Sequence, residues 1–205
     1  MKAFYEDVWA ELPEDPKPWA WERRRALLLA EAKPGQRVLD LGCGAGRFVA
    51  ALQDAGADPV GVEIAEAALE RARRNVPGAE LHALAADGAI PLEDATVDLV
   101  WCSEVLEHVP DTAGLLSEAR RVLRTGGRLL VTTPSHDPLR RVLLALTRFD
   151  AHFDPLGQHV RFYSRRSLAR VLGEFAFEDV RVSHIGGPPG LRETLVARGR
   201  KARLI

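Results

Sequence analysis

The sequence has few cysteines and no long apolar run. Cys43 and Cys102 are its only cysteines, and they lack the paired spacing of a zinc site or a redox motif. Two such thiols indicate a reducing compartment, so we expect a cytoplasmic protein. The longest apolar run near the amino terminus, Ala26–Ala30, is far too short to cross a bilayer. We therefore expect neither secretion nor membrane insertion.

An excess of either charge is also absent. The chain carries 28 Lys and Arg residues against 29 Asp and Glu residues, for a formal net charge of -1. Nucleic-acid-binding domains usually show a basic surface, so no nucleic-acid partner is expected. With 205 residues, 46% of them hydrophobic and 28% charged, the chain has a globular composition and a length that suits one domain, residues 1–205.

Short β-rich segments alternate with amphipathic helical segments from Gln36 onward. This alternation is typical of an α/β fold in which helices cover both faces of a doubly wound, mostly parallel sheet. Strands are predicted at Arg37–Leu41, Pro59–Glu63, Glu80–Leu84, Val97–Cys102 and Arg128–Thr132. Helices are predicted at Arg47–Asp54, Glu66–Asn75 and Thr112–Leu123.

The alternation breaks after Pro134. A helix is predicted at Pro138–Thr147, and the histidine-bearing loop RFDAHFDPLGQHVRFYS then leads to a helix at Arg165–Glu174. A loop of this length is typical of a lid or a binding loop, so residues 135–163 are predicted to form a lid over a substrate. Two final strands, Asp179–Ile185 and Arg192–Arg198, are joined by GGPPG and predict an antiparallel hairpin at one sheet edge.

The segment before the sheet, residues 1–34, is predicted to form a helical cap. It begins with aromatic residues and prolines and finishes as an amphipathic helix. Two interpretations remain open for Trp9, Trp19 and Trp21. They either pack this helix on the sheet or help to roof a ligand cleft.

A glycine-rich loop preceded by a carboxylate, VLDLGCGAGRF, follows the first predicted strand. In a doubly wound sheet, ligands bind beyond the carboxyl ends of the strands. A dinucleotide site would need G-x-G-x-x-G, whereas this chain has Gly42, Gly44 and Gly46 behind Asp40. Two unit charges ~4 Å apart at an effective dielectric constant near 20 interact by roughly 4 kcal/mol, so a carboxylate would repel a pyrophosphate and attract an ammonium group. The pattern favours S-adenosylmethionine, which has an amino-acid zwitterion, a ribose and an adenine but no phosphate.

This loop resembles the first motif of the class I S-adenosylmethionine-dependent methyltransferases. The segments VGVEIAEAALERAR, ALAADGAIPLEDATVDLVWCSEVLEHVPD and EARRVLRTGGRLLVTTP follow in the order of that family, and the resemblance covers about Pro34 to Val182. The family usually has Pro-Gly-Gly before its fifth strand, where this chain has Thr125. The resemblance, which is strongest to the ubiquinone and menaquinone type of small-molecule methyltransferase, implies a seven-stranded Rossmann-like sheet. It also implies transfer of a methyl group to a small-molecule acceptor, with oxygen as the expected acceptor atom.

The same resemblance implies a set of residues that hold the cofactor. Glu63 would accept the ribose hydroxyls, and Ile64 would lie against the adenine. Asp87 would accept a hydrogen bond from the adenine amine, with the backbone of Gly88 and Ala89 beside it. The remaining members, Ser103 and His108, would lie near the methionine part of the cofactor.

Histidines are the candidate bases of the reaction. His159 ranks first, because its segment GQHVRFYS resembles one that is common in the ubiquinone and menaquinone type of methyltransferase. His136 follows the fifth predicted strand and ranks second. A base typically adds 10²- to 10⁴-fold to a rate, whereas positioning supplies up to roughly 7 to 11 kcal/mol, so a base is not essential.

EVLEH, at residues 104–108, carries a further alternative. On a helix, residues three and four apart share a face. Some O-methyltransferases that resemble this subgroup hold a divalent ion with two such acids, the histidine and a later histidine. Here that set would be Glu104, Glu107, His108 and His159. The competing interpretation, under which no metal is expected, is that Glu107 and His108 brace the turn.

Two other functions compete with a small-molecule methyltransferase. A nicotinamide-dependent oxidoreductase on a similar sheet is opposed by the glycine spacing and by Asp40. A non-catalytic module that binds S-adenosylmethionine would need no acceptor site, and the histidine-bearing lid argues against it. The expected partners are a small-molecule substrate and, at most, a second copy of the chain, so the protein is a monomer or a homodimer.

Overall fold

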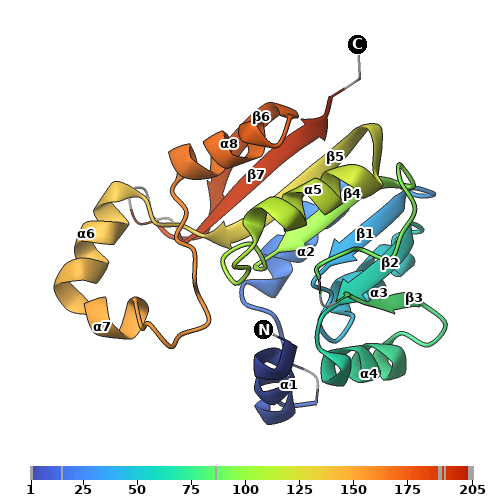
Figure 1. The fold of residues 1–205 in the computed structure, drawn as a ribbon, viewed down its shortest axis with the longest axis horizontal. Coiled ribbons are helices and arrows are strands. Elements are labelled where there is room, and N and C mark those ends of the chain that lie inside the picture. Colours follow the sequence, from blue (N-terminus) through green and yellow to red (C-terminus); the bar gives the residue numbers. More distant parts are fainter. Residues whose placement is uncertain (1, 15, 86, 189–190, 192, 203–205) are drawn as a thin grey trace.

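The computed structural model describes residues 2–14, 16–85, 87–188, 191 and 193–202. Its centre is one seven-stranded sheet with the strand order β3-β2-β1-β4-β5-β7-β6 (Figure 1). The strands are β1 (Arg37–Leu41), β2 (Asp58–Glu63), β3 (Glu80–Ala83), β4 (Val97–Ser103), β5 (Leu123–Pro134), β6 (Phe177–Ile185) and β7 (Thr194–Lys201). The predicted α/β sheet is thereby confirmed.

The strands from β3 to β5 run parallel, and β7 runs antiparallel to both of its neighbours. The predicted C-terminal hairpin of β6 and β7 is therefore present, but its second strand lies inside the sheet, between β5 and β6. The predicted start of that strand, Arg192, lies outside the described residues, as do Pro189 and Gly190 of the GGPPG connection. The strand order reverses between β1 and β4, so the carboxyl ends of these strands flank the crevice where ligands bind in such sheets.

Helices cover both faces of the sheet. Those before the predicted lid, residues 135–163, are α1 (Lys2–Glu11), α2 (Trp21–Glu31), α3 (Arg47–Asp54), α4 (Glu66–Asn75) and α5 (Thr112–Val122). Those after β5 are α6 (Pro138–Thr147), α7 (Phe149–His152) and α8 (Arg165–Glu174). Leu28 of α2 and Leu52 of α3 pack on one face with Leu99 and Trp101 of β4, and α5 and α8 pack on the other.

Several elements differ from the predicted ones. The chain is already extended at Leu123, because α5 ends one residue earlier, so β5 is longer than Arg128–Thr132. The predicted 148–164 loop contains one helical turn, α7. A separate helix, α1, precedes the amphipathic helix expected in residues 1–34, and none of its residues is buried.

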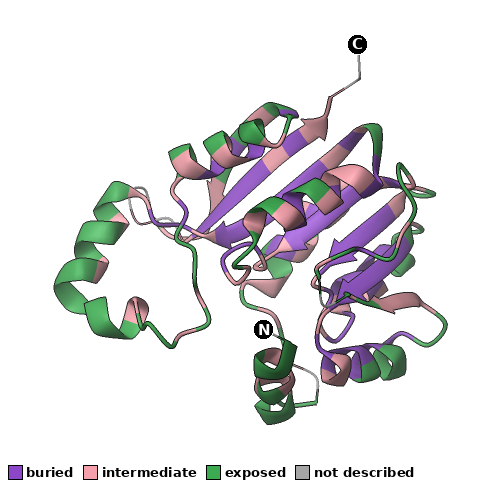
Figure 2. Ribbon diagram, viewed as in Figure 1, coloured by how far each residue is buried: buried purple, intermediate pink, exposed green. Residues whose placement is uncertain are grey.

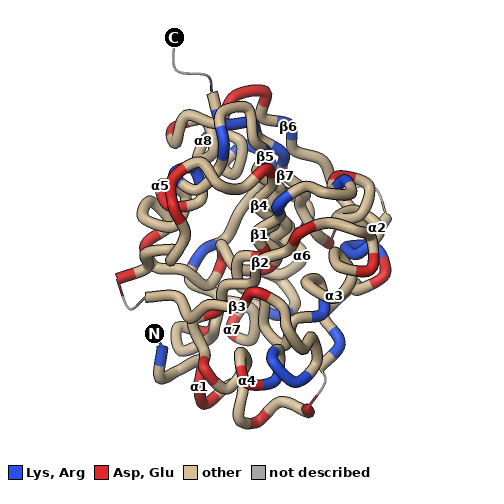
Figure 3. The backbone as a smooth tube through the Cα atoms, turned by 90° about the vertical axis from the view of Figure 1, so that its right-hand side faces the viewer, with Lys and Arg blue, Asp and Glu red and all other residues tan. Residues whose placement is uncertain are grey.

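The segment with α6 and α7 projects from the body of the molecule (Figures 1 and 2). Neither helix has a buried residue. Within the described part of the chain, no helix combines the length and apolar character needed to cross a membrane. Acidic and basic residues are interleaved along the backbone in the view of Figure 3.

Candidate active site

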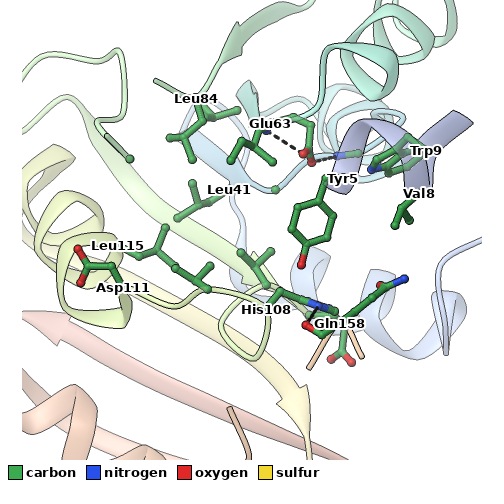
Figure 4. Close-up of a pocket in the computed structure, with 18 of the residues that line it drawn as sticks. Tyr5, Val8, Trp9, Leu41, Glu63, Leu84, His108, Asp111, Leu115 and Gln158 are labelled. Atoms are coloured by element: carbon green, nitrogen blue, oxygen red, sulfur yellow. Dashed lines mark hydrogen bonds between the residues drawn. The ribbon is translucent and has the colours of Figure 1, made fainter. Parts of the chain in front are cut away.

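A pocket of about 380 Å³ lies at the carboxyl ends of β1, β2 and β4, under α1 (Figure 4). Its wall is formed by the loop after β1, by Glu63 and Ile64 at the end of β2, and by the segment after β4. Asp87 and Gly88, after β3, complete one side. The pocket therefore sits where the reversal of strand order places a ligand.

The glycine loop is confined between α1 and the segment after β4. Gly42 has a φ of 81°, and a Cβ there would overlap Cγ2 of Val105. A Cβ on Gly44, whose φ is 52°, would lie 2.9 Å from the ring of Trp9. Both glycines line the pocket, whereas Gly46 packs on α4 and does not. The loop thus brings bare backbone to the ligand at two positions.

Asp40 lies near the end of β1, just before this loop; it is 1% exposed and is not among the residues that line the pocket. Its Oδ2 has no hydrogen-bond partner among the residues that the structure describes. Burial, reinforced by the charge of Glu63, raises the pKa of Asp40 to about 8, and the charge of Arg24 acts in the opposite direction. An unpaired buried carboxylate of this kind is stabilised by a cationic ligand.

Glu63 lines the pocket with a carboxylate that the backbone already holds. Gly44 N donates to its Oε2 at 3.0 Å, and Ile64 N donates to its Oε1 at 2.8 Å. Burial nevertheless raises the pKa of Glu63. Ala65 N also donates to Oε1, at 3.1 Å, so about one of the four lone-pair sites of the carboxylate remains to accept a hydroxyl group. Ile64 lines the pocket beside it.

The turn after β3 brings two of its three predicted members to the pocket. Asp87 and Gly88 line it, and Ala89 does not. Ala89 N donates to Oδ1 of Asp87 at 3.0 Å, a bond that shapes the turn. Ala89 therefore acts on this part of the site through the conformation of Asp87.

The roof of the pocket is formed by Tyr5, Val8 and Trp9 of α1 and by Leu12, which follows that helix. Trp9 thus takes the roofing role, whereas Trp21 packs on Phe48 with ring centroids 4.9 Å apart and Trp19 is 62% exposed. The two interpretations of the tryptophans therefore apply to different residues.

Glu6 attaches α1 to the body. Its carboxylate accepts from Glu66 N at 2.7 Å and Ala67 N at 3.0 Å, at the amino end of α4. Sequence reasoning missed Tyr5 and Glu6, although the acids and aromatics of FYEDVW were the available signal.

Arg24 of α2 is the buried cation beneath the pocket, with 3% exposure. Its Nη1 donates to Oγ of Ser103 at 2.8 Å and lies 4.0 Å from Oε1 of Glu104. Ser103 also shares a hydrogen bond with Thr132 and does not line the pocket. Ser103 thus contacts Arg24, a residue that the motifs did not indicate, and its contact with the cofactor stays a prediction.

Glu107, His108 and His159 come together, with one ligand atom of each within 4.8 Å of the others. Glu104 is not part of this group, since its Oε1 accepts from Thr132 Oγ1 at 2.9 Å. Glu107 is 1% exposed, and Thr133 Oγ1 donates to its Oε2 at 2.9 Å. The structure therefore assembles three of the four residues suggested as metal ligands.

The lid positions His108 and His159. Nδ1 of His108 lies 3.1 Å from the carbonyl oxygen of Gln158, and the His108 and His159 rings pack with centroids 4.8 Å apart. Val160 N and Arg161 N both donate to the carbonyl oxygen of Glu107. Burial lowers the pKa of both histidines, that of His108 to about 4. Both imidazoles are therefore neutral near pH 7.

His136 does not line the pocket. It is 2% exposed, and its Nε2 lies 2.8 Å from Nε2 of His152, beside the rings of Phe153 and Phe162. Burial lowers its pKa to about 4. The geometry thus separates the two predicted bases, with His159 next to His108 at the pocket and His136 in the base of the lid.

Comparisons with known proteins agree with this geometry. A sequence model of the methyltransferase domain matches residues 15–182. A ubiquinone biosynthesis O-methyltransferase of Burkholderia pseudomallei is 30% identical over 164 residues, which cover 76% of this chain and 70% of that protein. The chain belongs to the S-adenosylmethionine-dependent methyltransferases. The predicted family and cofactor of this methyltransferase are confirmed.

Other relatives are longer than this methyltransferase. An uncharacterized 37.1 kDa protein in a transposon of Streptomyces fradiae is 41% identical over 115 residues, or 53% of this chain and 33% of that protein. A ubiquinone biosynthesis O-methyltransferase of Idiomarina loihiensis is 31% identical over 157 residues, or 73% of this chain and 64% of that protein. The chain thus spans less than two thirds of both.

Solved structures share the fold. A phosphoethanolamine N-methyltransferase 2 of Haemonchus contortus, in complex with S-adenosyl-L-methionine, superposes with a TM-score of 0.72 at 17% identity, over 98% of this chain and 57% of that one. An S-adenosylmethionine-dependent methyltransferase of Mesorhizobium loti gives 0.68 at 22% identity, over 88% and 97%. These likenesses establish the Rossmann-like methyltransferase architecture.

Proposed function

We propose that this methyltransferase transfers a methyl group to an oxygen atom of a small-molecule acceptor, next to a divalent cation held by Glu107, His108 and His159. One observation supports the proposed cation. A carbonyl oxygen only accepts, so the contact with Gln158 assigns the proton of neutral His108 to Nδ1. The lone pair of Nε2 then faces Oε1 of Glu107 at 3.8 Å, and that oxygen has no hydrogen-bond partner among the described residues.

Two acceptors that face each other in a buried site require a proton or a cation between them. A histidine whose second ring nitrogen donates to a backbone carbonyl is also the usual metal-ligating arrangement. The mixed nitrogen and oxygen donors suit a first-row divalent cation such as Mn²⁺, with Mg²⁺ as a weaker match. A cation held there would lower the pKa of an acceptor hydroxyl group.

The charges around the pocket support this assignment. Asp40, Glu63, Glu104 and Glu107 supply four buried or half-buried carboxylates, and burial raises the pKa of each. Arg24 is the cation that the structure places among them. The negative excess favours positively charged ligands.

The cofactor side of the proposal uses the residues at the other end of the pocket. Bound S-adenosylmethionine supplies an electrophilic methyl group on a sulfonium. Asp40 favours its ammonium group, Glu63 accepts a ribose hydroxyl group, and Asp87 accepts from the adenine amine beside Ile64. The roof formed by Tyr5 and Trp9 excludes water from this end.

Oxygen as the acceptor atom is supported by the relatives from Burkholderia and Idiomarina, both named O-methyltransferases. His159 has a competing role, since as a neutral imidazole it could also accept the proton of the acceptor. Under that role the cation is dispensable. His136, buried against His152, supports the lid.

Turnover with and without metal separates these roles. Methyl transfer to a catechol and to the corresponding aromatic amine is measured after treatment with a chelator and after restoring Mn²⁺ or Mg²⁺. The proposal expects catechol methylation that is lost with the chelator, restored by the cation, and reduced about 10²-fold or more in Glu107→Gln and His159→Ala. His82→Ala, at a partly exposed histidine outside the pocket, is the matched control. Unchanged turnover under chelation would exclude a role for the cation in the reaction. A preference for the amine would exclude oxygen as the acceptor atom.

A further inference from the structure

The lid carries most of the exposed large apolar side chains of the described chain. Eleven such side chains are at least 38% exposed, and three of them, Phe4, Leu12 and Trp19, lie near the amino terminus. The other eight lie between residues 139 and 162 and are Leu139, Val142, Leu143, Leu146, Phe149, Leu156, Val160 and Phe162. A concentration of this kind on one segment marks an interaction surface.

Four of the eight form a stripe along α6. Leu139, Val142, Leu143 and Leu146 are spaced by three and four residues, so they share one face of the helix. Leu146, at 80% exposed, is the most open of them. The half-buried residues of α6, Arg140 and Leu144, are offset from this stripe, so the helix contacts the protein through a different face.

The lid has an aromatic cluster of its own, which does not use the stripe. The rings of Phe153 and Phe162 lie 4.8 Å apart, and both pack beside buried His136. Phe149 packs on Phe153 at 5.2 Å. The stripe on α6 is therefore not required for the internal packing of the lid, and it projects from the body with the helix (Figures 1 and 2).

The charge of this segment is opposite to that of the remaining chain. Between Pro138 and Arg166 the sequence has six of its 28 basic residues but only two of its 29 acidic ones. The six are Arg140, Arg141, Arg148, Arg161, Arg165 and Arg166. All except Arg140 are exposed. An apolar stripe on a projecting helix with surrounding arginines complements a surface that is apolar inside and anionic outside.

We propose that α6 docks this methyltransferase on the surface of an anionic phospholipid bilayer. The stripe from Leu139 to Leu146 enters the boundary between headgroups and acyl chains, and Arg141 and Arg148 interact with anionic headgroups. The helix is ten residues long, so it lies on the membrane and does not span it. The lid also carries Gln158 and His159, so docking would bring the acceptor side of the pocket close to the membrane.

Vesicle co-sedimentation of the whole chain tests this proposal without any assay of methyl transfer. The expected result is binding to vesicles that contain phosphatidylglycerol and much weaker binding to phosphatidylcholine alone, with an affinity that falls as salt rises. Leu146→Ser should weaken binding about tenfold or more, because one leucine no longer enters the bilayer. Arg141→Glu should weaken it by more than the about fivefold that one arginine contributes, because the charge is reversed.

Two matched variants control for general effects. Trp19→Ser removes a similarly exposed apolar side chain outside the lid, and Arg170→Glu makes the same charge change on α8. Both should bind vesicles like the wild type. Equal binding to neutral and anionic vesicles, no binding to either, or equal losses in the controls would overturn the proposal. A stable dimer in solution that Leu146→Ser dissociates would instead assign the stripe to a second copy of the chain.

Discussion

Oε1 of Glu107 and Nε2 of His108 lie 3.8 Å apart, and neither can donate a hydrogen to the other when the carboxylate is ionised and the neutral imidazole carries its proton on Nδ1. The pair is assembled by three separate segments. Glu107 and His108 follow β4, Thr133 of β5 holds one oxygen of Glu107, and the lid carbonyl of Gln158 orients His108. The proposed cation between them would account for the convergence of all three segments.

Asp40 should control the pH dependence of stability in the ligand-free protein. Its pKa is raised to about 8, so the folded state holds a proton that the unfolded state releases above about pH 4. The contribution of Asp40 to the free energy of unfolding is thus fully present below the pKa of this group in the unfolded state. It is lost as the pH rises towards 8. Asp40→Asn should reduce the slope of the free energy of unfolding against pH by up to about 1.4 kcal/mol per pH unit. Urea unfolding at pH 5 and pH 8 measures it, and an unchanged slope would contradict the assigned burial of the charge.

The same variant should bind S-adenosylmethionine about tenfold or more weakly at pH 8, because the carboxylate that favours the ammonium group is gone. Titration calorimetry with the cofactor measures this loss. Asp58→Asn, at an exposed carboxylate of β2, is the control and should bind like the wild type. Equal affinities for all three proteins would show that Asp40 does not contribute to binding of the cofactor.

Gly42→Ala should be much more damaging than Gly78→Ala. Both glycines have a φ of 81°, but a Cβ on Gly42 would overlap Val105 whereas a Cβ on Gly78 meets nothing within 4 Å. The shared φ costs both variants about 1 kcal/mol, so the difference between them isolates the close approach. Thermal unfolding with and without S-adenosylmethionine should show a further loss of about 1–3 kcal/mol in Gly42→Ala, together with a smaller shift on adding the cofactor. Matching losses in both variants would show that the loop has room to relax.

Glu6 should govern how quickly the cofactor leaves. Its carboxylate holds α1 over the pocket by capping the amino end of α4, and loss of such a cap costs about 1 kcal/mol. Glu6→Ala should therefore raise the dissociation rate of S-adenosylmethionine several-fold, with a smaller effect on folding stability because α1 buries no residue. Stopped-flow release of the cofactor measures this rate. Glu11→Ala, at the exposed end of the same helix, should release it at the wild-type rate. A wild-type dissociation rate in Glu6→Ala would show that α1 does not control release of the cofactor.

Much of the sheet was predictable because local signals and long-range packing agree there. Apolar strands bounded by glycines, as in VLDLGCGAG, need both faces covered, and this requirement leaves few alternatives to a mostly parallel sheet. The position of β7 between β5 and β6 was not predictable, since a hairpin signal specifies which strands pair but not which of them joins the sheet. Helix α1 was missed because it has no buried face and forms only against the pocket and α4.

The site was predictable where one motif carries both position and chemistry. Glu63 ends a strand, and the glycine loop and Asp87 each follow one, so the sequence places them at the same edge of the sheet. The role of Arg24 depends on a contact 79 residues away, with Ser103, and no local pattern indicates it. His136 and His159 looked alike as histidines on either side of the lid helix. Only the path of the lid determines that His159 reaches His108 and that His136 turns towards His152.

Direct binding of Mn²⁺ to the purified, chelator-treated protein tests the central claim most directly, because it depends on neither the acceptor nor turnover. Titration followed by electron paramagnetic resonance should show one bound Mn²⁺ per chain in the wild type and in His82→Ala, and an affinity about 10- to 100-fold lower in His159→Ala and in Glu107→Gln. Absence of bound Mn²⁺ in the wild type, or equal binding in all four proteins, would contradict the cation site of Glu107, His108 and His159.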